Sequence, residues 1–394
     1  MAGQLHNIPE TPSDQAAVAS APASFPVKPG ARGKLRSVSW LSWIVSDDPP
    51  GRFLLNAIVL LLLAAFLFAP FLFPGAKALG VASRICIFVI LVASYDLMLG
   101  YTGIVSFAHT MFFGIGAYGV AILLAKGWVG WGAVILGAAA SAAVSLVIAA
   151  VIGLLSLRLR AIFFSMITLA VASFAQILAE QWRSLTGGED GLTFSVPAIL
   201  LPSFRPLSHP VLGVTINGPV IAYYLTFVVA LVLFLVMLRI VNSPFGRVLQ
   251  AIRENEFRVE AMGYQTVAYR TMVCAMSAVM ASLAGALMAL VLGYNGPDTT
   301  LSFSLMIDIL LMIVIGGIGT MYGAIVGAVL VVLAEYYLQN ILGGINGAIA
   351  GTPFLSALFH PDRWLLWLGV LFVLIVIFFP QGLFGWLRQR GSAG

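Results

Sequence analysis

Long apolar runs alternate with short polar breaks along most of the chain. A helix needs ~20 mostly apolar residues to cross the ~30 Å hydrocarbon core of a membrane, and about ten of the runs approach this length. None shows the two-residue alternation of a membrane β-barrel. The pattern therefore predicts an all-α, polytopic membrane helical bundle of about ten transmembrane helices. The predicted spans are Phe53 to Phe73, Ala78 to Leu99, Gly103 to Ala125, Gly130 to Leu157, Ala161 to Trp182, Pro219 to Ile240, Thr271 to Leu292, Leu301 to Ile315, Thr320 to Gln339 and Trp364 to Phe379.

The polar parts of the chain define its predicted organisation. Residues 1–50 hold seven prolines, many alanines and serines and no apolar run, which predicts a disordered N-terminal extension. The membrane domain then covers 51–387, and residues 388–394 form a short tail. Two polar loops, 183–218 and 340–363, are rich in proline or glycine and too short to form domains. They serve either as connectors or as a landing surface for another protein.

The internal polar segment from Asn242 to Arg270 determines the predicted orientation. It carries four arginines between two spans, and short loops rich in Lys and Arg stay in the cytoplasm. If every run crosses the membrane once, both termini are cytoplasmic as well. Fourteen of the 20 Lys and Arg then lie on the cytoplasmic side and five on the other, with Arg84 inside a span. This asymmetry favours ten spans with the extension, the loop and the tail in the cytoplasm.

Composition agrees with a membrane protein. Apolar residues make up 61% of the chain and charged residues 9%, whereas about a quarter of a soluble domain is charged. The net charge of +5 does not indicate nucleic-acid binding, because the basic residues lie at the ends of spans and form no continuous patch. The sequence shows no spacing of Cys and His typical of a metal site, and we expect neither a metal nor a cofactor.

The same polar segment is predicted to be mostly helical. Arg253 and Glu256 lie three residues apart, Glu256 and Glu260 lie four apart, and Gly263 follows as a helix stop. A charged helical loop on the cytoplasmic side of a membrane protein is suited to contact another protein.

The loop also contains the pattern G-R-x-x-x-A-I-R-x-N-E-x-x-x-E-A-x-G. It is formed by Gly246-Arg247, Ala251-Ile252-Arg253, Asn255-Glu256, Glu260-Ala261 and Gly263. Further motifs stand at Tyr101 to His109, Phe113 to Tyr118, Ile315 to Thr320 and Pro380 to Leu383. In these motifs the chain resembles the permease subunits of ABC importers, in particular the branched-chain amino-acid (LivM-type) family. The resemblance covers roughly Ala78 to Leu387.

The resemblance implies a function and a set of partners. The loop corresponds to a coupling helix that docks into a groove on an ATPase subunit. The expected partners are a homologous LivH-like permease, two ATPase subunits that bind the ATP, a periplasmic or extracellular solute-binding protein and the lipid of the bacterial inner membrane. The expected substrate is a branched-chain amino acid or a related small polar solute. The residues carried over to coupling are Arg247, Arg253, Glu254, Asn255, Glu256, Glu260, Ala261 and Gly263.

An enzymatic activity is not expected. The chain has no G-x-x-x-x-G-K-[ST] loop, so it lacks the usual phosphate cradle for ATP. It also shows no arrangement of Ser, His and Asp or of Cys and His that suggests nucleophilic catalysis.

Ionisable and polar residues inside the spans are candidates for a translocation pathway, because a charge at the centre of a membrane helix is costly and is retained mainly for function. Asp96 and His109 flank the turn-like break from Gly100 to Gly103, with Ser106 three residues before His109. Broken helices expose backbone groups that bind substrates in transporters. Asp308 lies within the eighth span. The alternatives are that Asp96 caps a helix near the surface and that Asp308 packs between subunits.

Glycines indicate tight helix packing around the ninth span. Gly319, Gly323 and Gly327 recur every four residues, which places a smooth stripe on one face. The eighth span is short and ends at Gly316-Gly317, so it is predicted to turn tightly against the ninth.

Two functional hypotheses follow from these features. The first is a permease subunit of an ATP-driven importer. The second is a self-sufficient secondary transporter or channel in which Asp96, His109 and Asp308 relay protons. The charged loop favours the first hypothesis, because a secondary carrier has no need of an ATPase-docking helix. The sequence leaves the choice among amino acids, urea, amides and aromatic acids open.

Overall fold

The computed structural model describes residues 61–72, 75–128, 130–156, 161–206, 215–348, 358–379 and 382–383. These residues belong to one compact unit, and the predicted all-helical membrane bundle is confirmed. Within the described part, eight helices are long and apolar enough to cross a membrane. The first predicted span is described only over 61–72, so the number of ten stays a prediction. The expected N-terminal extension and C-terminal tail lie outside the described residues.

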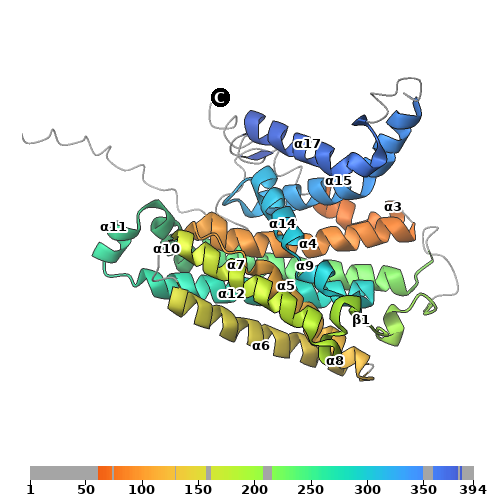
Figure 1. Ribbon diagram of the computed structural model, residues 1–394, viewed down its shortest axis with the longest axis horizontal. Coiled ribbons are helices and arrows are strands. Elements are labelled where there is room, and N and C mark those ends of the chain that lie inside the picture. Colours follow the sequence, from red (N-terminus) through yellow and green to blue (C-terminus); the bar gives the residue numbers. More distant parts are fainter. Residues whose placement is uncertain are drawn as a thin grey trace, which may run out of the picture. The chain divides into compact units, whose positions relative to one another are not determined.

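The helices and strands follow one another in a simple order (Figure 1). The elements are α3 (Ala69–Leu72), α4 (Ala76–Thr102), α5 (His109–Ala125), α6 (Trp131–Ser156), α7 (Ala161–Gln181), α8 (Arg183–Thr186), η1 (Gly188–Asp190), β1 (Leu192–Thr193), η2 (Ala198–Leu200), α9 (Gly218–Asn242), α10 (Pro244–Glu254), α11 (Glu256–Ala261), α12 (Thr266–Leu292), β2 (Tyr294–Asn295), α13 (Pro297–Thr300), α14 (Phe303–Gly316), α15 (Met321–Ala348), η3 (Pro361–Arg363) and α17 (Trp364–Phe378).

Helix α4 forms the centre of the bundle. It packs against α9, α12, α14 and α15, and 78% of its most apolar stretch is buried, compared with 6% for α17. A helix that is apolar on all sides is stable in a protein core or in lipid. Helix α4 therefore supplies the core, whereas much of α17 is left for contact with lipid or with another chain.

The loops at the two ends of α12 lie far apart. Helices α10 and α11 precede α12, and β2 follows it; Figure 1 shows α11 and β1 at opposite ends of the bundle. Strand β2 pairs antiparallel with β1, with Leu192 opposite Asn295. A helix of 27 residues is ~40 Å long at about 1.5 Å per residue, so the charged loop and the strand pair lie on opposite sides of the bundle.

The third predicted span begins later than expected. Helix α4 continues through Gly100 to Thr102, residues 103–108 are not helical, and α5 begins only at His109. The helix ends at Gly103, whose φ of 73° is a left-handed conformation that glycine adopts readily. The chain therefore does break between Asp96 and His109, but at residues 103–108, because Gly100 to Thr102 still belong to α4.

The eighth and ninth predicted spans form the expected tight turn. Helix α14 ends at Gly316 and α15 begins at Met321, with positive φ at Gly317 and Gly319. Gly323 and Gly327 lie so close to the α14 backbone that an added Cβ would overlap with it. The placement of Gly319 on the same helical stripe was wrong, because its φ of 83° puts it in the turn.

Candidate functional site

The charged loop consists of two helices and not one. Ser243 caps α10 by accepting a hydrogen bond from the Gly246 N–H, and Pro244 follows at the first helical position. At Asn255 the backbone turns extended, with φ −160°, and its side chain accepts from the Arg258 N–H at 3.0 Å to cap α11. The expectation of one helix through Arg253 and Glu256 was therefore wrong, because Asn255 favours a new cap over helix continuation.

The predicted glycine stop is present at the end of α11. The helix ends at Ala261, and Gly263 follows with a φ of 90°, where a residue with a side chain is strained.

Helix α10 is anchored to the membrane helices by its apolar face. Leu249 and Ile252 are buried, and α10 packs against α4, α9 and α12. Their spacing of three residues places both on one side of the helix, which leaves Arg247 and Glu254 exposed on the other. The loop is thus attached to the bundle through this apolar face.

Helix α11 is fastened to the start of α12 by polar contacts. Arg270 Nη1 lies 2.5 Å from Glu256 Oε1, and the Thr266 hydroxyl donates to Glu260 Oε1 at 2.6 Å. Val259 of α11 is buried. Two acids predicted to face a partner therefore hold the loop to its own protein.

The exposed surface of α11 is partly apolar. Phe257 is 84% exposed and Met262 is 61% exposed, with the exposed residues Glu254, Arg258 and Ala261 nearby in sequence. Sequence reasoning missed Phe257 and Met262, although two large apolar side chains in a charged loop are a signal that is readable in the sequence.

A second group of residues connects the loop to the helix ends; we call Asp96, Gly100, Arg253 and Gly319 the coupling junction. Arg253 Nη1 donates to the Gly100 carbonyl oxygen. The Gly319 N–H donates to Asp96 Oδ1 at 2.8 Å, and Arg253 attracts the same carboxylate electrostatically. Gly100 must lack a side chain, because a Cβ would overlap with the Gly319 backbone and with Asp96.

The C-terminal motif reaches the same region. Gly382, with a φ of 73°, lies so close to the backbone of Gly317 that a Cβ would overlap with it. Leu383 packs against the hydrophobic core. The motifs near positions 100, 253, 317 and 382 are far apart in the sequence, and the fold brings them together at one end of the bundle.

The four predicted pathway residues are not brought together. Asp96 belongs to the coupling junction. His109 is buried, with its Nε2 atom 2.9 Å from Ser94 Oγ and 3.2 Å from the Leu91 carbonyl oxygen. Ser106 accepts a hydrogen bond from the Ala108 N–H at 3.3 Å, just before α5. Asp308 lies elsewhere, in a group of charged residues on α4, α14 and α15.

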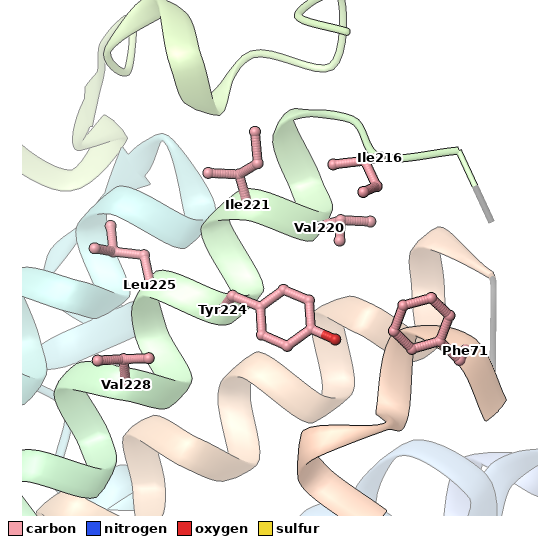
Figure 2. Close-up of a pocket in the computed structure, with 7 residues that line it drawn as sticks. All are labelled: Phe71, Ile216, Val220, Ile221, Tyr224, Leu225 and Val228. Atoms are coloured by element: carbon pink, nitrogen blue, oxygen red, sulfur yellow. The ribbon is translucent and has the colours of Figure 1, made fainter. Parts of the chain in front are cut away.

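A groove on the bundle surface is apolar. It has a volume of about 430 Å³, and Figure 2 shows the ring of Tyr224 on α9 pointing toward Phe71 on α3. The Tyr224 hydroxyl donates to the Leu67 carbonyl oxygen at 3.1 Å. The lining offers no charged group to a polar solute. The lining residues are Phe71, Ile216, Val220, Ile221, Tyr224, Leu225 and Val228.

Among the described residues, no group of three His, Cys, Asp or Glu is placed to hold a metal ion.

Comparison with known proteins assigns the family. The family described as "Branched-chain amino acid transport system / permease component" matches residues 77–379. The high-affinity branched-chain amino acid transport system permease protein LivM of Salmonella typhimurium is 26% identical over 326 residues, which cover 79% of this chain and 71% of that protein. LivM of Escherichia coli is 25% identical over 379 residues, which cover 92% and 83%. The probable LivM of Methanocaldococcus jannaschii is 27% identical over 260 residues, which cover 65% and 69%. No solved structure matches. The match spans the helices, the charged loop and the coupling junction, and the chain belongs to the permease component family of branched-chain amino acid transport systems.

Proposed function

We propose that the chain is the membrane-spanning subunit of an ATP-driven importer of branched-chain amino acids in the bacterial inner membrane. It forms the pathway with a homologous permease. Two separate ATPase subunits bind and hydrolyse ATP, and an external solute-binding protein delivers the substrate. The relatives are named as components of branched-chain amino acid transport, and these names support the substrate class.

The exposed surface of α11 carries the proposal. Large apolar side chains rimmed by charge mark a contact site for another protein, and Phe257 and Met262 are such side chains. Glu254 and Arg258 supply the charged rim. In the proposal, Phe257 and Met262 enter the groove of an ATPase subunit, and the charges select the partner and its orientation.

The contacts of the loop support a coupling role for the remaining predicted residues. Glu256 and Glu260 hold α11 to α12, Asn255 sets the angle between α10 and α11, and Arg253 joins the loop to Gly100. A displacement of the docked ATPase subunit is thereby transmitted to α4 and to the turn before α15. The contacts of Glu256, Glu260 and Arg253 link the proposed docking surface directly to the membrane helices α12 and α4.

Reconstitution tests the proposal. In liposomes, the chain alone is expected neither to hydrolyse ATP nor to concentrate leucine under a proton gradient. With its partner permease, the ATPase subunits and a loaded binding protein, uptake of radioactive leucine is expected to require ATP on the side of the ATPase subunits. Gradient-driven accumulation by the isolated chain would contradict the proposal and favour a secondary transporter, with Asp96, His109 and Asp308 as the first proton-relay candidates.

A further inference from the structure

Asp96 is a buried acid whose carboxylate holds a backbone group of another helix pair. Its side chain belongs to a residue that is 1% exposed, and Oδ1 accepts a hydrogen bond from the Gly319 N–H at 2.8 Å. Gly319 belongs to the connection between α14 and α15, residues 317–320, which we call the α14–α15 turn. The turn immediately precedes the 28-residue helix α15, and a carboxylate is electrostatically favoured beside a helix N-terminus. Asp96 therefore fastens the start of α15 to α4.

The contact around Asp96 leaves no space for a further atom. A Cβ on Gly100 would lie 2.5 Å from the Gly319 nitrogen and would overlap with Asp96 Oδ1. Residues without a side chain allow such a close approach of two membrane segments. Arg253 reaches the same place, because its Nη1 donates to the Gly100 carbonyl oxygen and lies 2.8 Å from the position that a Cβ on Gly319 would take. The charged loop, α4 and the α14–α15 turn thus meet at one contact.

The α14–α15 turn is closely packed against both of its helices. A Cβ on Gly316 of α14 would overlap with the α15 backbone, and a Cβ on Gly327 of α15 would overlap with the α14 backbone. The C-terminal motif also contacts the turn, since a Cβ on Gly382 would lie 2.5 Å from the Gly317 nitrogen. Elements packed this tightly shift as units and do not deform continuously. A displacement of the turn therefore displaces α14 and α15 together.

The position of Asp96 along α4 does not suit a substrate site. At about 1.5 Å per residue, Asp96 lies only ~6 Å from Gly100, at the end of α4 that contacts the charged loop. Substrate sites in transporters lie near the middle of the membrane. The carboxylate is also almost completely buried and faces the backbone of Gly319. Its place and its partner connect Asp96 with the loop and not with a solute.

From these contacts we propose that Asp96 is a positioning residue for coupling, which fastens the α14–α15 turn to α4 at the point where Arg253 arrives from the charged loop. Movement of the loop then displaces α14 and α15 as one body. Asp96 acts through the hydrogen bond that Oδ1 accepts and through the close fit at Gly100, and it neither binds the solute nor transfers a proton. The inference rests on the proposed import function, because only a docked ATPase subunit would drive the loop.

Two substitutions of Asp96 separate this role from a role in the pathway. Asp96→Asn keeps the shape and the Oδ1 acceptor but removes the acid, and its leucine uptake is expected to stay within about threefold of wild type. Asp96→Glu keeps the acid but adds a methylene to a contact that has no space for it, and its uptake is expected to fall ~10-fold or more. A proton relay or an ammonium site requires the acid and predicts the opposite order.

A pair of glycine variants on α4 tests the close fit without changing any polar group. Gly100→Ala introduces the overlapping Cβ and is expected to lower uptake ~10-fold or more. The matched control is Gly80→Ala on the same helix, where a Cβ would meet no atom within 4 Å, and its uptake is expected to stay within about twofold of wild type.

Uptake and ATP hydrolysis are measured in the same proteoliposomes with the complete transporter. In Asp96→Glu and Gly100→Ala, hydrolysis is expected to lose its stimulation by the loaded binding protein. Basal hydrolysis and copurification of the ATPase subunits are expected to stay within about twofold of wild type, because neither change touches the exposed surface of α11. This combination distinguishes a coupling defect from a general loss of structure.

The outcomes separate the inference from the proposed function. Loss of uptake by Asp96→Asn, or normal uptake by Asp96→Glu or Gly100→Ala, overturns the inference while ATP-driven uptake by the wild type upholds the proposed function. A parallel loss of basal hydrolysis and copurification in Asp96→Glu and Gly100→Ala would mean a role in folding only and would also overturn the inference. If the wild-type complex takes up no leucine with ATP, the proposed function fails first, and the inference fails with it.

Discussion

Replacing Arg253 with alanine is the most direct test of the coupling junction. Arg253 Nη1 donates to the Gly100 carbonyl oxygen, and its charge also attracts Asp96. A hydrogen bond to a charged group contributes ~1.5–3 kcal/mol. Because the Arg253 side chain is exposed to solvent, screening reduces this contribution to ~1–2 kcal/mol. Such a loss lowers the equilibrium constant for the contact between Arg253 and Gly100 by a factor of about 5–30.

The expected phenotype is uncoupling and not loss of assembly. Arg253→Ala leaves the exposed side chains of Phe257 and Met262 in place, so the ATPase subunits are expected to copurify with the permease. Leucine uptake is expected to fall by about 5–30-fold, and ATP hydrolysis is expected to lose its stimulation by the loaded binding protein. Arg253→Lys keeps the charge and one donor and is expected to retain part of the activity.

A contrasting variant on the docking surface provides the control. Phe257→Asp removes the exposed ring from α11 without touching Gly100, and it is expected to reduce copurification of the ATPase subunits. Stimulated ATP hydrolysis and normal uptake by Arg253→Ala would refute the role of the coupling junction. Loss of copurification in Arg253→Ala, with Phe257→Asp unaffected, would show that the docking surface has been placed on the wrong residues.

Two further predictions concern the loop and the orientation. Glu256→Lys places a positive charge beside Arg270, whose Nη1 lies 2.5 Å from the Glu256 carboxylate in the present structure. Gly263→Val imposes a left-handed backbone on a β-branched residue at a cost of ~1–3 kcal/mol. Both variants are expected to abolish uptake in reconstituted complexes and to leave membrane insertion, checked by the yield in purified membranes, unchanged. In a chain without native cysteines, Glu189→Cys is expected to react with an impermeant maleimide added to intact cells, and Asn255→Cys is not; the reverse labelling pattern would invert the topology.

The helices themselves were largely predictable from the sequence. An apolar run of sufficient length predicts one membrane helix, because insertion into lipid depends on local composition and length. The ends of the runs were less predictable. Helix α4 continues to Thr102 because Gly103 supplies the αL stop, and the charged loop divides at Asn255 because its side chain caps α11. In both cases one capping residue set the helix boundary, within a segment whose other residues favour a different boundary.

The candidate site was predictable only in part. The charged loop could be located from its charge and its motif, since both lie within one short segment. The coupling junction joins Asp96 to Gly319, and Arg84 on α4 contacts Glu335 on α15, 251 residues away in the sequence. Neither contact can be predicted from neighbouring residues in the sequence, because each depends on how distant segments pack against α4. The unusual presence of Arg84 in a span was visible, but its partners were not.

Helix α4 connects the coupling junction to Arg84 through one continuous helix. It runs from Ala76 to Thr102 without a proline, and sharp bends in helices arise mainly at proline or at comparable local defects. Gly100 at one end touches Arg253, and Arg84 lies ~24 Å away along the same axis. In the proposed coupling mechanism, a displacement of the charged loop by 1–2 Å, about the size of many helix shifts, therefore reaches Arg84 almost undiminished. Such a movement requires no series of side-chain rearrangements between Gly100 and Arg84, because the backbone of α4 transmits it.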